Sequence, residues 1–336
     1  MDLYINTRGS YLHVKDELFE IKIPEAGKKG AYVKHHIAAR KVRSIILSQS
    51  SALSTDAILL ALKNNIDIIV SEWNGQPVGR FWHSKHGSTS RIRKEQLEAS
   101  KSEAALVWSR RWISAKLRAQ SELLKNLARH RKKKREIINE SIGRISSLRS
   151  KVSELHARNI EEAAETLRGL EGTAGRIYFE TLSRLMPGRY RFSGRSMRPA
   201  QDPFNACLNY CYGVLYSKIE KALILAGLDP YLGFLHRDDY NQKSMVFDFI
   251  EPYRPWADEV VFKLFSGKQM KDAYFKELSN GVSLDDDGKP VLIAAYNKFF
   301  EEQKIRYKGR NQNRHNIIQF DAHAFANQLI SKSGTP

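Results

Sequence analysis

Short segments of alternating or β-branched apolar residues dominate the first 85 or so positions of the chain. Such segments predict β-strands at 3–5, 11–14, 19–23, 44–47, 66–70 and 78–82. One helix is expected among them, over Ala57–Lys63, because Ser54 can cap it and Asp56 falls in its first turn. Asn74-Gly75 predicts a tight hairpin turn, since both central positions of that turn take positive φ. The pattern indicates a compact β-rich domain.

A polar, glycine-containing stretch at 85–90 separates this region from one with a different pattern. Beyond it, apolar residues recur at helical spacing, which predicts helices at 95–120, 121–160, 203–226, 255–265, 290–307 and 316–331. A length of 336 residues agrees with more than one hydrophobic core. We therefore expect an α+β chain of two domains, 1–86 and 94–336, joined by a linker at 87–93.

The chain is strongly basic, with 55 Lys and Arg against 37 Asp and Glu and a formal net charge of +18. This excess favours an anionic partner, either nucleic acid or a membrane surface. The sequence has no apolar run of about 18 residues, and Met1–Tyr4 lacks the basic and apolar regions of a signal peptide. We expect nucleic acid as the partner, no membrane association and a cytoplasmic location.

The two cysteines, Cys207 and Cys211, lie four residues apart in a segment expected to be helical. A disulfide is not expected at this spacing in a large chain, and no further cysteine exists to complete a zinc site. Both thiols are therefore expected to be reduced.

The longest basic run lies between Lys125 and Lys151 and contains Arg131-Lys132-Lys133-Lys134-Arg135. Two interpretations of it stay open. It can be a solvated helix face or a loop between helices, or it can contact phosphates directly.

Glu171 is the first acidic candidate for a functional site. It is expected to end a helical stretch, because Gly172 follows it, and an exposed helix-end carboxylate is the ordinary interpretation. Gly169, Gly172 and Gly175 nevertheless recur every third residue, and each weakens a helix by up to about 1 kcal/mol relative to Ala. Such a pattern makes sense where another backbone or a ligand approaches closely.

His236, Asp248 and Glu251 form a second group of candidates ahead of a Pro-Tyr-Arg-Pro turn. A histidine after an apolar triplet is usually structural. The Asp248–Glu251 spacing fits a helix capping box, in which both side chains accept backbone N–H groups. On a helix the same spacing also places both carboxylates on one face, so a cap and a metal site are compatible.

Taken together, these acids and one imidazole suit a divalent metal ion. Carboxylates favour Mg²⁺ or Mn²⁺, and the imidazole shifts the preference toward Mn²⁺. In a basic chain such an ion would act on a nucleic-acid phosphate, by polarising a phosphoryl oxygen and activating a hydroxyl or water. Metal-dependent phosphodiester chemistry is one hypothesis that the residues support.

Several segments, in their order and spacing, resemble the CRISPR-associated integrase/endonuclease family, the "Cas-one" proteins of spacer acquisition. The resemblance covers nearly the whole chain and is carried by Arg43–Ile58, Ile66–Arg80, Glu171–Phe179, Arg195–Leu215 and Leu235–Pro255. It implies an N-terminal β-sandwich with one helix, which dimerises, and a C-terminal all-α catalytic domain. It further implies a homodimer that joins a small ferredoxin-like partner, "Cas-two", in a heterohexamer on double-stranded DNA.

The resemblance also implies roles for individual residues. The metal ligands for Mg²⁺ or Mn²⁺ would be Glu171, His236 and Glu251, with Asp248 as a supporting catalytic acid. The DNA contacts that it implies are Arg80, Arg168, Asn205, Tyr212 and Arg254. Asp238 and Asp239 stand where some relatives have a lysine.

The implied reaction is a transesterification in which the 3′-hydroxyl of a short DNA duplex attacks a phosphodiester of the CRISPR array. With water as the nucleophile, the same site would act as a nuclease. Two other interpretations remain, a noncatalytic DNA-binding scaffold and a related integrase of a mobile element.

Overall fold

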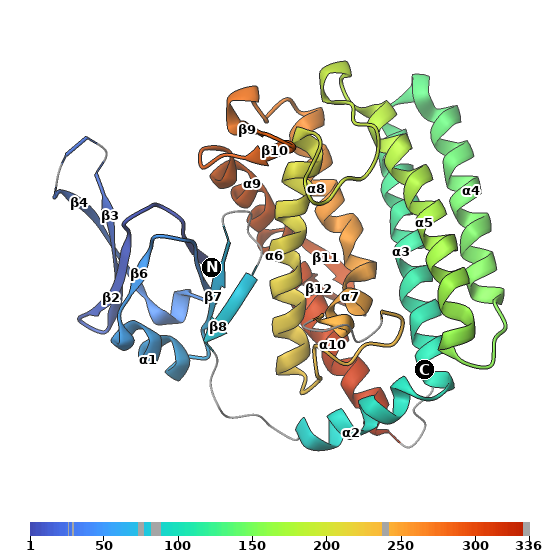
Figure 1. Cartoon of the computed structure of the whole chain (residues 1–336), viewed down its shortest axis with the longest axis horizontal. Coiled ribbons are helices and arrows are strands. Elements are labelled where there is room, and N and C mark those ends of the chain that lie inside the picture. The colour runs from blue at the N-terminus through green and yellow to red at the C-terminus, as the bar shows by residue number, and fades with distance from the viewer. Residues whose placement is uncertain (26, 29, 73–76, 82–88, 237–241, 332–336) are drawn as a thin grey trace. The chain divides into compact units, whose positions relative to one another are not determined.

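The computed structural model describes residues 1–336 except 26, 29, 73–76, 82–88, 237–241 and 332–336 (Figure 1). The chain divides into two compact units, Met1–His86 and Gly87–Pro336. The first unit is built of strands and the second mainly of helices, which is the expected α+β class. In the described part of the chain, no helix is long and apolar enough to cross a membrane.

The described residues of the N-terminal unit form two four-stranded sheets. The strands of one sheet, in spatial order, are β1 (Asp2–Ile5), β5 (Ser44–Leu47), β7 (Asp67–Ser71) and β8 (Pro77–Phe81). Those of the other are β4 (Tyr32–Ala38), β3 (Leu18–Pro24), β2 (Tyr11–Lys15) and β6 (Ala52–Leu53). Leu12 and Phe19 of the second sheet share one buried cluster with Ile45 and Ile68 of the first. This common core holds the sheets together as in a sandwich.

Helix α1 (Thr55–Lys63) is the only helix with α geometry among the described residues of this unit, and its N-cap is the predicted one. Ser54 Oγ accepts a hydrogen bond from the Ala57 amide at 3.2 Å. Strands β4 and β6 were not predicted. Residues 32–36 of β4 are all exposed, so this edge strand has no apolar alternation to reveal it. The predicted Asn74-Gly75 turn lies outside the described residues.

Where it is described, the helical unit is built mainly of helices, together with two short hairpins. The helices are α2 (Thr89–Ser100), α3 (Glu103–Arg129), α4 (Arg135–Glu154), α5 (Ile160–Leu185), α6 (Pro203–Leu225), α7 (Ser244–Ile250), α8 (Arg254–Ser266), α9 (Gly288–Asn297) and α10 (Arg314–Ile330). The hairpins are β9 (Phe275–Leu278) with β10 (Gly281–Leu284), and β11 (Lys304–Tyr307) with β12 (Arg310–Asn313). Helices α3, α4 and α5 lie side by side (Figure 1). Helix α6, buried along most of its length, packs against α7, α8 and α10.

Several predicted helices differ from those in the structure. The one expected at 95–120 is interrupted before α3, where Ser102 accepts a hydrogen bond from the Ala104 amide at 3.3 Å and caps the new helix. The one at 121–160 is interrupted by a 3-10 turn over Lys132–Lys134. The one at 290–307 ends in a π turn, Lys298–Glu302, and β11 follows. Helix α2 begins inside the expected linker, at Thr89.

The expectation that Glu171 ends a helix was also wrong. Glu171 lies in the middle of α5, which continues to Leu185 through all three glycines. A Cβ added at Gly169, Gly172 or Gly175 would have no neighbour within 4 Å, so no described backbone makes the close approach that these glycines suggested. The helix is stabilised instead by apolar packing of its other face, which includes Leu167, Ala174, Ile177, Tyr178 and Leu182.

Candidate active site

The central feature of the helical unit is a lysine shared by two of the predicted acids. Lys116 comes from α3, Glu171 from α5, and Glu251 from the 3-10 turn Glu251–Tyr253 that follows α7. Lys116 Nζ contacts Glu171 Oε1 and lies 2.5 Å from Glu251 Oε2. Arg254 Nε donates to Glu251 Oε1 at 2.7 Å. The fold thus brings Glu171 and Glu251 to one cation.

Lys116 and Glu251 are buried, whereas the side chain of Glu171 is 23% exposed, and the charges of the cluster shift the pKa values of the two buried members. The side chains of Lys116 and Glu251 are 10% and 7% exposed. Burial alone would raise the pKa of Glu251, but Arg254 and Lys116 lower that pKa to about 2. Burial likewise opposes the charge on Lys116, yet Glu251 and Glu171 raise its pKa above the ordinary value. Both acids therefore face a charged ammonium group at neutral pH.

Asp248 organises the segment that carries His236. One of its oxygens accepts hydrogen bonds from the amides of Phe234 and Leu235 at 2.6 and 3.0 Å, and the other accepts one from the His236 amide at 3.2 Å. The capping-box interpretation is therefore wrong, because Asp248 lies within α7 and binds a segment remote in sequence. Among the described residues, no side chain caps the following helix α8.

The imidazole of His236 is oriented by the same carboxylate. Its Nδ1 lies 2.6 Å from Asp248 Oδ1, which leaves Nε2 as the nitrogen available to a ligand. Burial lowers the pKa of His236, but the hydrogen bond and the charge of Asp248 raise it above the ordinary value. Arg168 donates to the neighbouring Leu235 carbonyl at 3.3 Å, so it also positions this segment. Asp238 and Asp239 lie outside the described residues.

The donor set fits a hard or borderline divalent ion, since it offers two carboxylates and an imidazole whose other nitrogen is fixed by a third carboxylate. These side chains are not yet arranged as the coordination sphere of a metal ion. In the described part of the chain, the ligand atoms of Glu171, His236 and Glu251 do not all lie within 4.8 Å of one another. Glu171 and Glu251 are instead bridged by Lys116.

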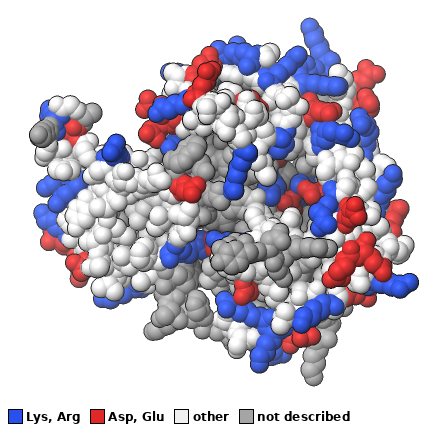
Figure 2. Space-filling model, viewed as in Figure 1, with Lys and Arg blue, Asp and Glu red and all other residues white. Residues whose placement is uncertain are grey.

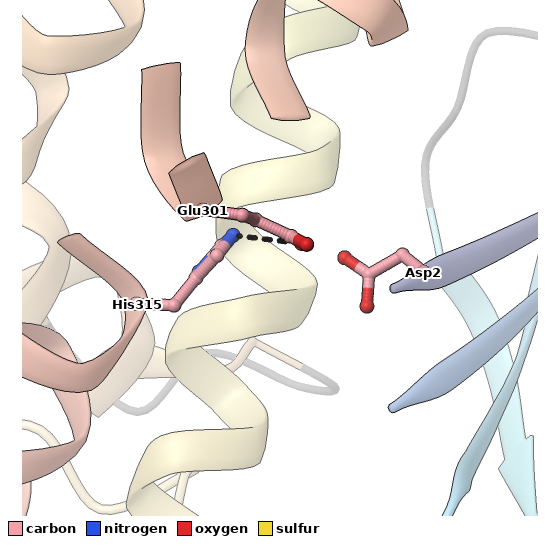
Figure 3. A group of neighbouring side chains, drawn as sticks. All are labelled: Asp2, Glu301 and His315. Atoms are coloured by element: carbon pink, nitrogen blue, oxygen red, sulfur yellow. Dashed lines mark ion pairs between the residues drawn. The ribbon is translucent and has the colours of Figure 1, made fainter. Parts of the chain in front are cut away.

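Figure 3 draws three other side chains, of which Asp2 belongs to the N-terminal unit and Glu301 and His315 belong to the helical unit. His315 Nε2 lies 3.7 Å from Glu301 Oε1 within the helical unit. Asp2 belongs to the N-terminal unit, where it accepts a hydrogen bond from Ser44 at 2.5 Å. We assign no metal site to these three residues.

Tyr212 and Arg254, both predicted to contact DNA, pack against each other beside Glu251. The Arg254 guanidinium carbon lies 4.8 Å from the centre of the Tyr212 ring, and Arg254 donates to the Tyr216 hydroxyl at 2.7 Å. Tyr212 is buried, and its hydroxyl donates to Asp258 Oδ1 at 2.6 Å. In this arrangement Tyr212 supports Arg254, which in turn holds Glu251.

Asn205 and Arg80, also predicted to contact DNA, each have structural partners in their own unit. Asn205 is fully buried on α6; its side-chain oxygen accepts from Arg195 at 2.9 Å, and its amide donates to the Gly194 carbonyl at 2.8 Å. It therefore fastens the segment before α6. Arg80 lies on β8 of the N-terminal unit, 3.1 Å from the buried Asp67. Cys207 and Cys211 are free and buried, as expected.

Lys116 and Asp258 are the residues that sequence reasoning missed. Lys116 follows Trp112 by one helical turn and is adjacent to Leu117, so it lies on the buried face of α3. A lysine among apolar positions at helical spacing was a usable signal, because buried lysines are rare unless they are paired. Asp258 gave no comparable signal, since its partners Tyr178 and Tyr212 are distant in sequence.

Comparison with known proteins places the chain in one family. The family model described as CRISPR associated protein Cas1 matches residues 3–298. A CRISPR-associated endonuclease Cas1 of Archaeoglobus fulgidus is 33% identical over 96% of this chain and 94% of its own length. A CRISPR-associated endonuclease Cas1 of Thermus thermophilus is 31% identical over 91% of this chain and 87% of its own length.

Solved structures share the fold. A casposase bound to an integration product covers 98% of this chain and 90% of its own, with a TM-score of 0.82 and 23% identity. A Cas1 protein from Thermotoga maritima covers 98% and 97%, with a TM-score of 0.78 and 22% identity. On the family model and the sequence relatives, this chain belongs to the Cas1 family of CRISPR-associated proteins.

Proposed function

We propose that this chain is a metal-dependent DNA integrase and endonuclease that inserts short DNA duplexes into a CRISPR array. The observation that carries the proposal is the buried cluster of Glu171 and Glu251, with His236 oriented by Asp248, in a chain of the Cas1 family. A pair of acids and an imidazole is a donor set suited to Mg²⁺ or Mn²⁺. A bound ion would supply charge stabilisation at the attacked phosphate and a lower pKa for the attacking hydroxyl.

The protein's own residues would divide the remaining work. Glu171, Glu251 and His236 Nε2 would hold the ion. Asp248 keeps the imidazole in one orientation and fixes the backbone around it with three hydrogen bonds. Arg254 holds Glu251 ionised and carries positive charge toward the site, where a phosphate would come.

In the proposed reaction, the 3′-oxygen of the incoming duplex forms a bond to the phosphorus and the array's own 3′-oxygen leaves. The number of phosphodiester bonds stays constant, so no external energy source is required. With water as the nucleophile, the same step is hydrolysis. No covalent enzyme intermediate is needed.

DNA is the proposed partner because of the charge excess and the basic surface. Figure 2 shows Lys and Arg side chains spread over the visible face, with Asp and Glu among them. A hollow of about 480 Å³ is lined by Leu185 and the run Arg129–Lys134, in which Lys132 and Lys133 are exposed. This basic lining supports the proposal that the run contacts phosphates. Arg168, which is exposed beside Glu171, is a second proposed contact.

We further propose assembly as a homodimer with the small partner Cas2. The support is the shared fold with a chain of a Cas6-RT-Cas1–Cas2 complex, at a TM-score of 0.77 and 19% identity. The casposase likeness supports a second candidate, integration for a mobile element. A target that contains a CRISPR leader and repeat, tested against a scrambled target, separates the two, because only the CRISPR function requires the repeat.

The test is a joining assay with the purified chain, Cas2, a 3′-hydroxyl DNA duplex and a supercoiled CRISPR plasmid, in Mn²⁺ or Mg²⁺. We expect covalent joining that EDTA and Glu251→Ala abolish while DNA binding persists. Glu165→Ala, an exposed acid on α5, is the matched control. Because removal of a buried charge can unfold a protein, thermal stability is measured in parallel. Tight DNA binding without joining, identical in both variants, would leave only a noncatalytic scaffold.

A further inference from the structure

Lys116 occupies the two carboxylates that the proposed function assigns to a divalent ion. Its Nζ contacts one oxygen of Glu171 and lies 2.5 Å from one oxygen of Glu251. All three side chains belong to the helical unit and come from separate elements. The acids therefore already share a monovalent cation, and a second cation has to compete for the same oxygens.

The balance of charge favours exchange over addition. With His236 counted as neutral, the form that binds a metal ion, three carboxylates, Glu171, Asp248 and Glu251, face two cations, Lys116 and Arg254, which leaves one net negative charge. A divalent ion beside Lys116 would turn this into a net positive charge, whereas its exchange for Lys116 leaves the cluster neutral. Uncompensated charge is costly at such low exposure.

The two cations differ in how firmly they are held. Arg254 bonds both Glu251 and the Tyr216 hydroxyl, and its guanidinium stacks on Tyr212. The Lys116 ammonium has the two carboxylates as its partners. A lysine also places a compact charge on a flexible stem, which can turn away without breaking a planar fork. Lys116 is thus the cation suited to leave.

We propose that Lys116 is a resident counter-cation that holds Glu171 and Glu251 together and gives them up when a divalent metal ion binds. The inference rests on the proposed function only in its assignment of a metal to these acids. Lys116 then has two effects. It stabilises the acids in the fold, and it raises the metal concentration that the site needs.

The first experiment measures Mn²⁺ binding by calorimetry on the full chain, without DNA, for wild type, Lys116→Met and Lys125→Met. Methionine keeps an unbranched side chain, one atom shorter than that of lysine, and removes its charge, and exposed Lys125 on the same helix is the matched control. We expect Lys116→Met to bind Mn²⁺ at least about tenfold more tightly than wild type and Lys125→Met to bind like wild type. In EDTA, Lys116→Met should melt at a lower temperature, and Mn²⁺ should raise its melting temperature more than that of wild type.

A second experiment uses the wild-type chain, so it does not depend on the variant folding. An amine-reactive acetylating reagent is applied with and without saturating Mn²⁺, and modification is read by mass spectrometry. Lys116 is buried in the structure without metal, so its acetylation should increase when Mn²⁺ is added and fall to the original level when EDTA removes the ion. Acetylation of Lys125 should stay constant.

The outcomes separate this inference from the proposed reaction. Equal or weaker Mn²⁺ binding by Lys116→Met, or unchanged acetylation of Lys116, overturns the exchange. Absence of Mn²⁺ binding in every protein overturns both the exchange and the metal-dependent function. If Lys116→Met binds Mn²⁺ more tightly than wild type but the wild-type chain joins no DNA, the proposed reaction is refuted and the exchange is still supported.

Discussion

Asp258 offers a sharp test of the electrostatics around the site. It lies on α8, is 1% exposed, and accepts the hydroxyls of Tyr178 at 3.0 Å and Tyr212 at 2.6 Å. These bonds join α5, α6 and α8. Burial nevertheless outweighs them and raises the pKa of Asp258 to about 6, from an ordinary 3.8. The substitution Asp258→Asn removes the titration and keeps the shape of the side chain.

The sign and size of the effect follow from that difference. Because the folded chain holds the Asp258 proton up to about pH 6 and the unfolded chain releases it near 3.8, stability falls as the pH rises through this window. At about 1.4 kcal/mol per pH unit, and with the unfolded carboxyl already more than half ionised at pH 4, the loss between pH 4 and 7 is about 2.4 kcal/mol. The free energy of unfolding of wild type, minus that of Asp258→Asn, should therefore drop by about this amount.

The assay is urea unfolding followed by circular dichroism between pH 4 and 7.5, with each free energy extrapolated to water. Exposed Asp272, replaced by Asn, is the matched control for loss of a carboxylate. A wild-type minus Asp258→Asn difference that stays flat, or that rises with pH, would refute the reasoning. It would mean that Asp258 is ionised in the fold throughout this range.

Three further predictions concern the site and its surroundings. Asp248→Ala leaves three backbone amides without their acceptor, so it should destabilise the chain by about 3 kcal/mol or more in thermal unfolding, whereas exposed Asp272→Ala should not. Gly172→Ala should stabilise α5 by up to about 1 kcal/mol, because the added Cβ has no neighbour within 4 Å. If DNA approaches this face of α5, the same substitution should reduce DNA joining, and unchanged joining contradicts such an approach. Replacing Lys132, Lys133 and Lys134 by Gln should weaken DNA binding and reduce by about 2 to 3 the magnitude of the slope of log binding constant against log salt concentration. An unchanged slope would mean that these lysines face solvent and do not contact phosphates.

How much of the fold could be read from the sequence depends on how local its causes are. The strand at 44–47 and the helix that Ser54 caps were predictable, because β-branched runs and capping side chains act over a few residues. Exposed β4 was not, since its pairing with β3 determines it. Helix α5 continues through Gly169, Gly172 and Gly175 because packing of its opposite face outweighs their low helix propensity.

The candidate site was predictable in its residues and not in its arrangement. Glu171, His236, Asp248 and Glu251 could be singled out from motif resemblance. That Asp248 binds three amides of another segment follows only from tertiary structure. The same is true of Lys116, which is 55 positions from Glu171 in the sequence and in contact with it in the fold. Local spacing even misled, because it suggested a helix cap for Asp248.

The cost of this cluster is itself an argument about function. Buried carboxylates and cations lose their hydration, and apolar side chains of similar size would stabilise the same packing at least as well. Such packing is already present beside them. Trp112, one turn before Lys116, lies 5.9 Å from the ring of Phe249 and 5.3 Å from that of Phe325. Helix α3, which carries Lys116, is thus joined to α7, which carries Asp248, by an aromatic contact that does not involve the charges. Charged residues that are costly to bury and not required for packing point to a functional role for this cluster. The metal exchange at Lys116 and the joining assay with Glu251→Ala are therefore two independent tests of the same cluster.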